Sequence, residues 1–406
     1  MKKELSLLSL FLVLLLSVSC STADYMDNID NLKDATYSSS YENTMEEKHL
    51  DTRVLSGQFA SRLMESVDAD SNVLFSPMLL QMSLTWLADC ATDDVRAEVM
   101  SLLGRQPVKW AEWQRAVALS SSWLSRMLSE ELTLAHAVWL QEGTPLVLPP
   151  SSGSYAPHVS FVDFGQKEET WQYVWEWMER TKPVAWDPSC ISPFLAACRQ
   201  SAMLGVAMFK DSFQYPFEEL EMDVPFTCAD GTERKLAMAS GHFDKLAYAE
   251  NERMQCVELP YKNGYTSLRL FLPKEGYSVS DIIGDANGDV EMKKGKVCLK
   301  MPCAYMYGYR DWKASLLELG FDELLTNDGA PGGAAAGAGN APPCPSALGQ
   351  QVQLIIEQEV ETDKGNAAIA AEESAYRSVS LDHPYLFTLV ENSTGLVLLE
   401  GQFVQP

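Results

Sequence analysis

Apolar residues with helical spacing predict helices at the start of the folded part of the chain. Phe59, Leu63 and Val67 stand four residues apart, so they share one face of a helix and form a buried stripe. Ser76 and Pro77 follow a short apolar run, and this pair is typical of an N-cap with proline in the first helical turn. The first part of the domain is therefore predicted to be rich in helix.

The same spacing predicts later helices, and strand-like runs become frequent after residue 200. The later helices are expected at Thr92 to Gly104, at Trp171 to Met178 and at Trp312 to Gly320. Strands are expected at residues 254–259, 266–272, 352–356, 385–390 and 396–404, with turns at 260–264 and 391–395. Helices come first and strands dominate later, which is the pattern of an α+β domain.

The N-terminus has the pattern of an export signal. Lys2 and Lys3 precede an almost unbroken apolar run, Leu5 to Val18, which is too short to span a membrane as a helix. A small residue precedes Cys20 and suits cleavage there. We therefore expect residues 1–19 to be a bacterial lipoprotein signal with lipid attached at Cys20. The alternative is a plain secretory signal with an incidental cysteine.

Composition and charge indicate how the rest of the chain is organised and which partners are unfavourable for it. Residues 20–50 are polar and acidic, so we expect a flexible tether. Residues 51–406 show no clear boundary and are expected to form one domain with a Gly/Ala/Pro-rich loop at residues 328–348. The whole chain is 46% hydrophobic and carries a formal net charge of −25 at pH 7, which argues against nucleic acid as a partner.

The sequence contains no familiar pattern of catalytic or metal-binding residues. Its five histidines lie in no metal-binding or nucleophile-activating spacing, and G-x-S-x-G, H-E-x-x-H and phosphate-binding glycine motifs are absent. Residues 285–289 resemble the opening of a calcium loop, but Val290 stands where that loop requires glycine. The cysteine spacings match neither a zinc site nor a compact disulfide framework. We therefore expect no enzyme activity, no cofactor and no metal.

Several short motifs occur together in an order that is hard to produce by chance. They are Asn72-Val73-Leu74-Phe75-Ser76-Pro77, Phe209-Lys210 with Pro216-Phe217, Val257-Glu258-Leu259-Pro260-Tyr261 with Leu272-Pro273, Asp382-His383-Pro384-Tyr385-Leu386-Phe387, and Gly401-Gln402-Phe403-Val404-Gln405-Pro406. Over nearly all of residues 55–406, this set of motifs resembles the serpin family.

The resemblance implies three β-sheets surrounded by about eight or nine helices, with an exposed reactive-centre loop near the C-terminus. In an inhibitory member, a serine-type or cysteine-type endopeptidase attacks this loop as a substrate and forms an acyl bond with it. The cut loop then inserts into the central sheet as a new strand and distorts the trapped protease. The native fold is therefore expected to be metastable.

The resemblance assigns the hinge and reactive loop to residues 362–381. Small side chains suit a segment that passes between packed strands, and Gly365 supplies backbone freedom. The hinge residues are Lys364, Gly365, Asn366, Ala367, Ala368, Ala370 and Ala371. We expect the reactive bond at Arg377–Ser378, since arginine suits a protease with an acidic primary pocket. Cleavage after Tyr376 is the alternative, and Arg377 is otherwise an ordinary solvated loop charge.

The chain departs from the family pattern at the hinge and at the polar cluster that latches the central sheet. Lys364 stands where glycine is usual, and either Glu372 or Glu373 faces inward in an inserted strand, which is costly for an unpaired carboxylate. Only five residues, Val379 to His383, separate Ser378 from Pro384. At the sheet-latch positions Ser76 is kept, while Leu79, Gly205 and Leu354 replace serine, asparagine and histidine.

The expected function is therefore a bacterial protease inhibitor that acts as a suicide substrate, with a serine-type or cysteine-type protease as its partner. We expect a monomer whose only membrane contact is a lipid anchor on Cys20, at the cell surface or the periplasmic membrane face. The departures at the hinge favour, as an alternative, a non-inhibitory surface binding protein with the serpin fold. A hydrolase with scattered catalytic residues is a third hypothesis.

Overall fold

The structure is a computed structural model of a single chain. It describes residues 57–89, 91–103, 109–144, 155–181, 192–286, 288, 290–303, 305–326, 344–357, 359–360 and 376–406. All of these residues belong to one compact unit, Lys48–Pro406. The predicted export signal, Cys20, the acidic tether and all the hinge residues lie outside the described residues.

The described residues contain nine helical segments, within the eight or nine that the resemblance implies. They are residues 57–65, α4 (Pro77–Asp89), α5 (Asp93–Leu102), α6 (Trp110–Met127), α7 (Lys167–Arg180), α8 (Ser192–Ala197), α9 (Val279–Ala286), α10 (Lys313–Glu318) and α11 (Asp322–Leu325). None of the described helices is both long enough and apolar enough to cross a membrane.

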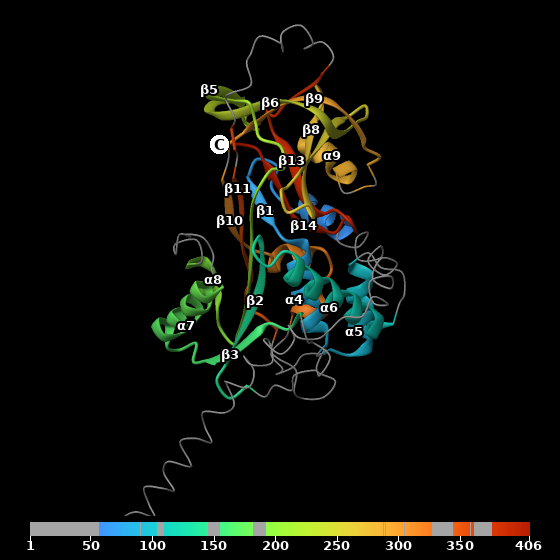
Figure 1. The fold of residues 1–406 in the computed structure, drawn as a ribbon. Coiled ribbons are helices and arrows are strands. Elements are labelled where there is room, and N and C mark those ends of the chain that lie inside the picture. The colour runs from blue at the N-terminus through green and yellow to red at the C-terminus, as the bar shows by residue number, and fades with distance from the viewer. Residues whose placement is uncertain are drawn as a thin grey trace, which may run out of the picture. The chain divides into compact units, whose positions relative to one another are not determined.

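A five-stranded sheet lies at the centre of the fold (Figure 1). Its strands, in spatial order, are β10 (Met306–Asp311), β11 (Leu348–Glu357), β4 (Ser201–Ser212), β2 (Leu132–Gln141) and β3 (His158–Val162). β11 and β4 run parallel and pair along the whole length of β11, whereas their outer neighbours β10 and β2 pair with them antiparallel. β11 begins at Leu348, the last residue of the predicted Gly/Ala/Pro-rich loop.

The remaining strands form one nine-stranded sheet. In spatial order they are β1 (Val73–Phe75), β14 (Val397–Phe403), β13 (Tyr385–Glu391), β8 (Thr266–Pro273), β7 (Met254–Pro260), β6 (Glu233–Glu250), β9 (Lys293–Pro302) and β12 (Arg377–Ser380), with β5 (Glu219–Thr227) also paired to β6. β6 has 18 residues; its last part pairs with β7 and its earlier part with β9 and β5. Two of the three sheets expected from the resemblance are therefore joined through β6.

The five-stranded sheet buries both of its faces. On one face lies α4, whose 13 residues are all buried, as expected for a helix that is apolar on every side. On the other face α7 and α8 cover a second apolar cluster that includes Trp139, Trp177 and Phe194 (Figure 1). In α7 the buried tryptophan is Trp177, whereas Trp171 and Trp175 are only partly buried.

Candidate reactive site and sheet latch

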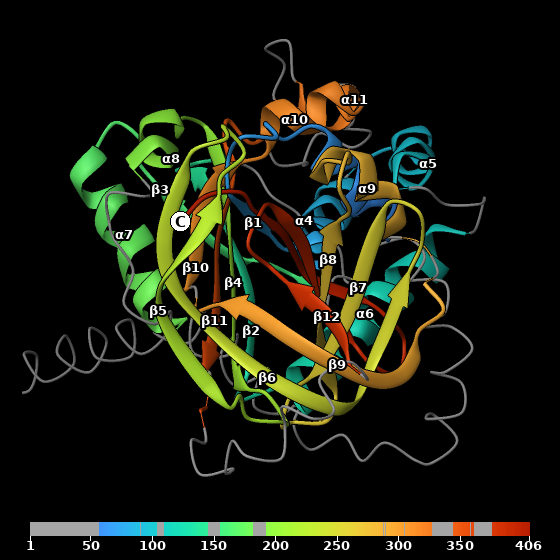
Figure 2. The same cartoon turned by 90° about the horizontal axis from the view of Figure 1, so that it is seen from above.

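The predicted reactive bond lies at the start of an edge strand. Arg377 and Ser378 are the first residues of β12, which pairs parallel to β9 at the end of the nine-stranded sheet (Figure 2). Both residues are exposed, but Val379 directly after them is only 2% exposed. The C-terminal end of the predicted reactive loop, residues 377–380, is thus strand rather than loop.

The alternative reactive residue, Tyr376, is held by side chains of β6. Its hydroxyl donates a hydrogen bond to Asp244 Oδ1 at 2.8 Å, and its ring meets the ring of His242 edge to face, with centroids 5.2 Å apart. The Lys296 ammonium of β9 lies 5.0 Å from the centroid of the Tyr376 ring. On its other side, His242 Nδ1 lies 2.9 Å from Glu218 Oε2. Both the hydroxyl and the ring of Tyr376 are therefore in contact with β6.

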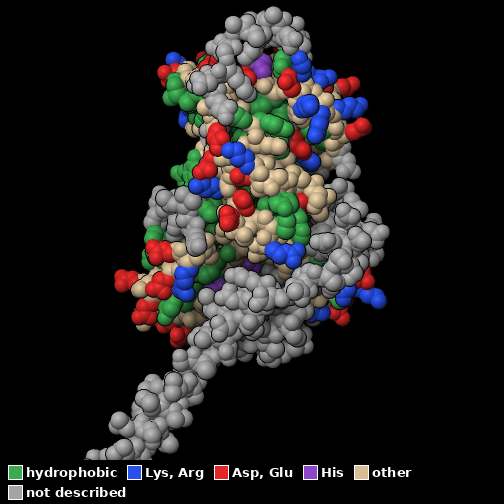
Figure 3. All heavy atoms as spheres, viewed as in Figure 1, with side chains coloured by type: hydrophobic (Ala, Val, Ile, Leu, Met, Phe, Trp, Pro, Cys, Tyr) green, Lys and Arg blue, Asp and Glu red, His purple; other side chains and the backbone are tan. Residues whose placement is uncertain are grey.

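The Arg377 side chain lies over an aromatic ring of β6. Its guanidinium carbon lies 5.1 Å from the centroid of the Tyr248 ring, a cation–π arrangement. Burial is the main reason that the pKa of Tyr248 is raised, and the nearby Arg377 charge opposes that shift. β9 carries Lys293, Lys294 and Lys296. Basic and acidic side chains are interspersed at the end of the protein where β9 lies (Figure 3).

A protease binds its substrate as an extended strand within its own cleft. Arg377 and Ser378 pair with Val297 and Cys298 of β9. Cleavage between Arg377 and Ser378 therefore requires the first residues of β12 to leave β9 before the protease can bind them. The assignment of this bond stays a prediction.

The predicted hinge follows β11 in the sequence, and β11 belongs to the strand pair that an inserted segment would separate. After β11, Val360 forms a parallel bridge with Phe217, whose backbone N–H donates to the Glu359 carbonyl at 2.9 Å. β11 and β4 are in register over ten residue pairs, from Leu348 and Met203 to Glu357 and Ser212. The central sheet is thus closed, with no strand between β4 and β11.

At the predicted latch, Ser76 joins α4 to both sheets. Its Oγ donates to the Leu398 carbonyl of β14 at 2.7 Å and accepts the Leu79 N–H at 3.2 Å, so it caps α4 as predicted. Its backbone N–H and carbonyl bond to the side-chain amide of Gln350 in β11, at 3.1 and 3.0 Å. Gln350 therefore provides a polar contact with the central sheet that the sequence analysis does not identify.

The three substituted latch positions are buried and apolar, and Leu79 lies against Gly205. A Cβ on Gly205 of β4 would lie 2.8 Å from Leu79 Cδ2, so the missing side chain at Gly205 makes room for Leu79. Leu354 is 1% exposed, lies opposite Phe209 of β4 and belongs to the main apolar core. The replacements found in the sequence thus complement one another in volume.

A buried polar chain that the sequence analysis missed connects α4 to β2. His136 Nε2 donates to the Tyr155 carbonyl at 2.8 Å, which leaves Nδ1 to accept the Ser83 hydroxyl proton at 2.9 Å. The Tyr155 hydroxyl in turn donates to Asp89 Oδ2 at 2.7 Å. His136 and Gly205 are directly opposite in the sheet, so this chain lies next to the predicted latch. A polar residue within the apolar run of β2 is the only sequence signal for it.

Burial changes the acid–base behaviour of this polar chain. Desolvation lowers the pKa of His136 to about 4, although the hydrogen bond to the Tyr155 carbonyl acts in the opposite direction. Desolvation also raises the pKa of Asp89, against the hydrogen bonds that it receives from Tyr155, Trp110 and Gln114. The neutral imidazole is therefore part of the native packing between α4 and the central sheet.

We expect acid to destabilise the protein through His136. Below pH 6.5 the unfolded chain binds a proton at this residue, whereas the folded protein does not until the pH falls to about 4. The free energy of unfolding should therefore decrease across this window, by roughly 3 kcal/mol from this residue. Denaturant unfolding of the wild-type protein and of His136→Gln between pH 7 and pH 4 measures the contribution. Curves of equal pH dependence would contradict it.

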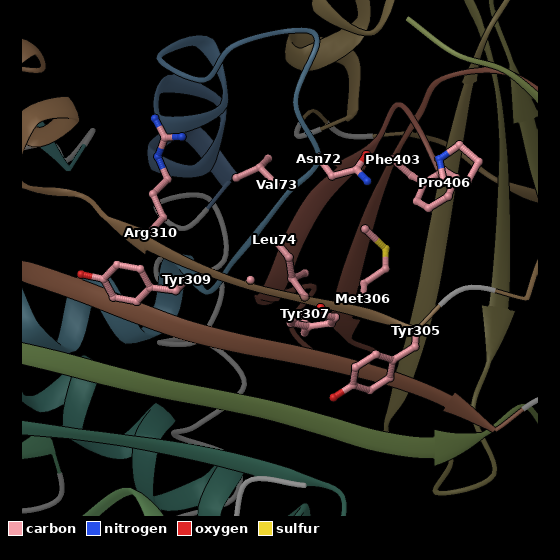
Figure 4. Close-up of a pocket in the computed structure, with 11 residues that line it drawn as sticks. Asn72, Val73, Leu74, Tyr305, Met306, Tyr307, Tyr309, Arg310, Phe403 and Pro406 are labelled. Carbon is pink, nitrogen blue, oxygen red and sulfur yellow. The ribbon is translucent and has the colours of Figure 1, made fainter. Parts of the chain in front are cut away.

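The structure also has a pocket of about 400 Å³ away from the reactive site, between the edge strands β10 and β1. It is lined by Asn72, Val73, Leu74, Tyr305, Met306, Tyr307, Gly308, Tyr309, Arg310, Phe403 and Pro406. Figure 4 shows Leu74, Met306 and Tyr307 together, with Arg310 extending toward the other end. These side chains offer aromatic and apolar contact but no paired acid and base. Among the described residues no group of three or more potential ligands is placed to hold a metal ion.

Comparison with known proteins gives one consistent family. The family model for serpins, serine protease inhibitors, matches residues 55–406. A serpin-like protein of Methanosarcina mazei is 24% identical over 383 residues, covering 85% of this chain and 84% of its own. Human neuroserpin is 22% identical and covers 84% of this chain and 88% of its own. Neither relative is similar enough to transfer a particular protease target.

Solved serpin structures share the fold at low sequence identity. Native protease nexin-1, crystallised with heparin, superposes with a TM-score of 0.71 at 17% identity and covers 88% of this chain and 100% of that chain. SRPN18 from Anopheles gambiae superposes with a TM-score of 0.69 at 14% identity and covers 87% of this chain and 97% of that chain. The family model covers the whole described region, and the chain therefore belongs to the serpin family.

Proposed function

We propose that this protein inhibits serine-type endopeptidases as a suicide substrate, with cysteine-type endopeptidases as a second target class. The central observation is the parallel pairing of β4 and β11 in a sheet whose neighbouring pairs, β10 with β11 and β2 with β4, are antiparallel. The reactive segment follows β11 directly in the chain. A strand formed from it between β4 and β11 would run antiparallel to both.

Insertion of such a strand would improve the hydrogen bonding of the sheet. Parallel pairs are slightly less stable per residue than antiparallel pairs. Insertion would replace one parallel ladder of ten pairs by two antiparallel ladders, so the inserted state has more backbone hydrogen bonds than the native state. This difference supports a metastable native state, in which the hydrogen bonds gained by the central sheet drive insertion.

The covalent step follows from ordinary protease chemistry. The protease nucleophile forms a bond to the Arg377 carbonyl carbon, the bond between Arg377 and Ser378 breaks, and the new Ser378 amine takes up the proton. The acyl bond then holds the protease at the end of the freed segment. From Gly365 to Arg377 this segment spans roughly 43 Å when extended, at about 3.3 Å per residue. Insertion would therefore carry the acylated protease a long way from its docking position before hydrolysis.

We expect Arg377→Ala to prevent trapping of a trypsin-like protease. Loss of the side chain that fills an acidic primary pocket should slow complex formation by about 100-fold or more. The measurement is the yield and rate of a complex that survives denaturing gel electrophoresis, with trypsin-like, elastase-like and papain-like proteases. Tyr376→Ala is the matched control and should leave trapping of the trypsin-like protease within a few-fold. If Tyr376→Ala reduced complex formation more than Arg377→Ala, the reactive bond would be assigned after Tyr376 instead.

A non-inhibitory binding function is the second candidate, and one observation favours it. Arg377 and Ser378 are paired with β9, and Tyr376 is hydrogen-bonded to Asp244, so the predicted reactive bond is held to the protein surface. The same gel assay separates the two functions. Cleavage by every protease of the panel without any covalent complex would support the binding function.

A further inference from the structure

The pocket between β10 and β1 is open because β10 carries a glycine there. Side chains alternate along a strand, so Gly308 shares a face with Met306 and Arg310. A Cβ on Gly308 would meet no atom within 4 Å, so the strand leaves a gap between the side chains of Met306 and Arg310. All three residues line the pocket of about 400 Å³.

Apolar and aromatic side chains form the walls of this pocket. Val73 and Leu74 of β1 and Phe403 of β14 are buried and line it. Tyr305 and Tyr307 also line it, with ring centroids 5.4 Å apart, and both of these rings are exposed. A pocket of this size with walls of this kind suits the hydrocarbon part of a small ligand.

Arg310 brings a positive charge to the pocket lining, at the end next to Val73 (Figure 4). Its guanidinium carbon lies 4.9 Å from the centroid of the Trp312 ring. Nη2 lies 3.5 Å from Ser315 Oγ, at the outer limit for a hydrogen bond, and Nε is buried without a partner in the described parts of the chain. The guanidinium is therefore held in place by ring contact more than by hydrogen bonds.

No acid of the described residues forms an ion pair with Arg310. Asp68 and Glu318 are near enough to raise its pKa, but burial acts more strongly and lowers the pKa. A desolvated guanidinium that lacks acceptors keeps a cost in free energy. Because the planar guanidinium matches a carboxylate in geometry, a bound carboxylate would supply those acceptors.

The outer edge of β10 adds backbone donors to the pocket lining. The Trp312 N–H donates to a carbonyl of β11, and in an antiparallel pair alternate residues direct their backbone groups to the partner strand. Arg310 therefore bonds to β11 through its backbone, whereas the backbone N–H groups of Tyr307 and Tyr309 point away from β11, where β10 has no neighbouring strand. The pocket thus combines apolar walls with donors and lacks carboxylate side chains.

We propose that this pocket binds a small amphipathic carboxylate, with its charged group at Arg310 and its apolar body over Gly308, against Leu74 and Met306. The formal net charge of −25 gives an anion no long-range attraction, so the preference for a carboxylate comes from Arg310. The pocket lies apart from the reactive bond at the start of β12, and the inference does not depend on the inhibitory function.

The test compares 2-naphthoate with 2-naphthylmethanol, which has the same ring system without the charge. Isothermal titration calorimetry at pH 7 should show that the wild-type protein binds the naphthoate about tenfold or more tightly than the alcohol, because a hydrogen bond to a charged group is stronger than a neutral one. Arg310→Met should remove this preference and leave binding of the alcohol within a few-fold. Arg180→Met is the matched control, since it removes the same charge from an exposed position in α7.

A substitution that fills the gap tests the position of the ligand. Gly308→Leu should abolish binding of both compounds, and it should fold because a side chain there meets no atom of the closed structure. Gly284→Leu in α9 is the matched control, because its added side chain also enters open space. Circular dichroism checks the fold of each variant. Equal affinity of the wild type for the two compounds, no binding of the naphthoate, or full binding by Gly308→Leu would each overturn the inference.

Discussion

Cutting the reactive segment of the wild-type protein should raise its melting temperature by roughly 20 °C. An inserted strand of about ten residues gains hydrogen bonds on both sides, while one parallel ladder of ten pairs is lost. The net gain is about ten backbone hydrogen bonds at about 1 kcal/mol each. For a domain of this size, each kcal/mol corresponds to about 2 °C. Thermal unfolding followed by circular dichroism measures the change.

A rise in melting temperature on cleavage is unusual. A break in the chain normally adds conformational freedom without adding contacts, so it does not stabilise the fold. The test requires a protease that cuts only at Tyr376, Arg377 or Ser378, because about ten residues must remain attached to β11 to form the inserted strand. Mass spectrometry of the fragments identifies the bond. Protein cut within the predicted loop at residues 328–348, ahead of β11, is the matched control, and its melting temperature should not rise. An unchanged or lower melting temperature after cleavage at Tyr376, Arg377 or Ser378 would contradict insertion.

Short-range patterns in the sequence predict the elements around the central sheet well. The serine–proline pair at residues 76 and 77 does begin α4, and Ser76 accepts the N–H of Leu79 as an N-cap should. The hairpin expected around residues 260–264 forms between β7 and β8. The terminal hairpin forms as β13 and β14. Each of these elements carries a local turn or cap signal, so its prediction does not depend on distant residues.

The strands that make the central sheet are harder to predict. β4 is almost continuously buried from Ser201 to Phe209, because β11 and β2 flank it and both faces of the sheet are covered. A strand buried on both faces shows no alternation, and an apolar run alone does not distinguish it from a helix. The same argument applies to β2, and to its buried His136, whose partners Ser83 and Tyr155 are distant in the sequence.

The candidate site was also only partly predictable. The family motifs locate the reactive region, but the pairing of Arg377 and Ser378 with β9 depends on a strand about 80 residues earlier. From the sequence alone, Leu79 and Gly205 are interpreted as the loss of two polar side chains of the latch. In the structure they compensate each other in volume, because Leu79 occupies the space that a side chain at Gly205 would need. Such compensation becomes visible only when the two positions are seen in contact.

The second large effect is expected from a covalent clamp across the sheet. Ala207 of β4 and Val352 of β11 are directly opposite in the parallel ladder and fully buried. Neighbouring strands lie about 4.8 Å apart, within the Cα separation that a disulfide accepts. The Ala207→Cys/Val352→Cys variant, once oxidised, should be unable to separate β4 from β11.

The oxidised clamp should convert the inhibitor into an ordinary substrate. If insertion is blocked, the acyl bond hydrolyses, and the yield of gel-stable complex should fall by about 100-fold or more, which corresponds to about 3 kcal/mol in the partition between trapping and release. Reduction of the same sample should restore the complex and the rise in melting temperature on cleavage. The single variants Ala207→Cys and Val352→Cys should trap protease under both conditions, which excludes an effect of the native free cysteines such as Cys228 and Cys256. Because the clamp leaves the reactive segment itself unchanged, undiminished trapping by the oxidised protein would show that inhibition does not need the sheet to open.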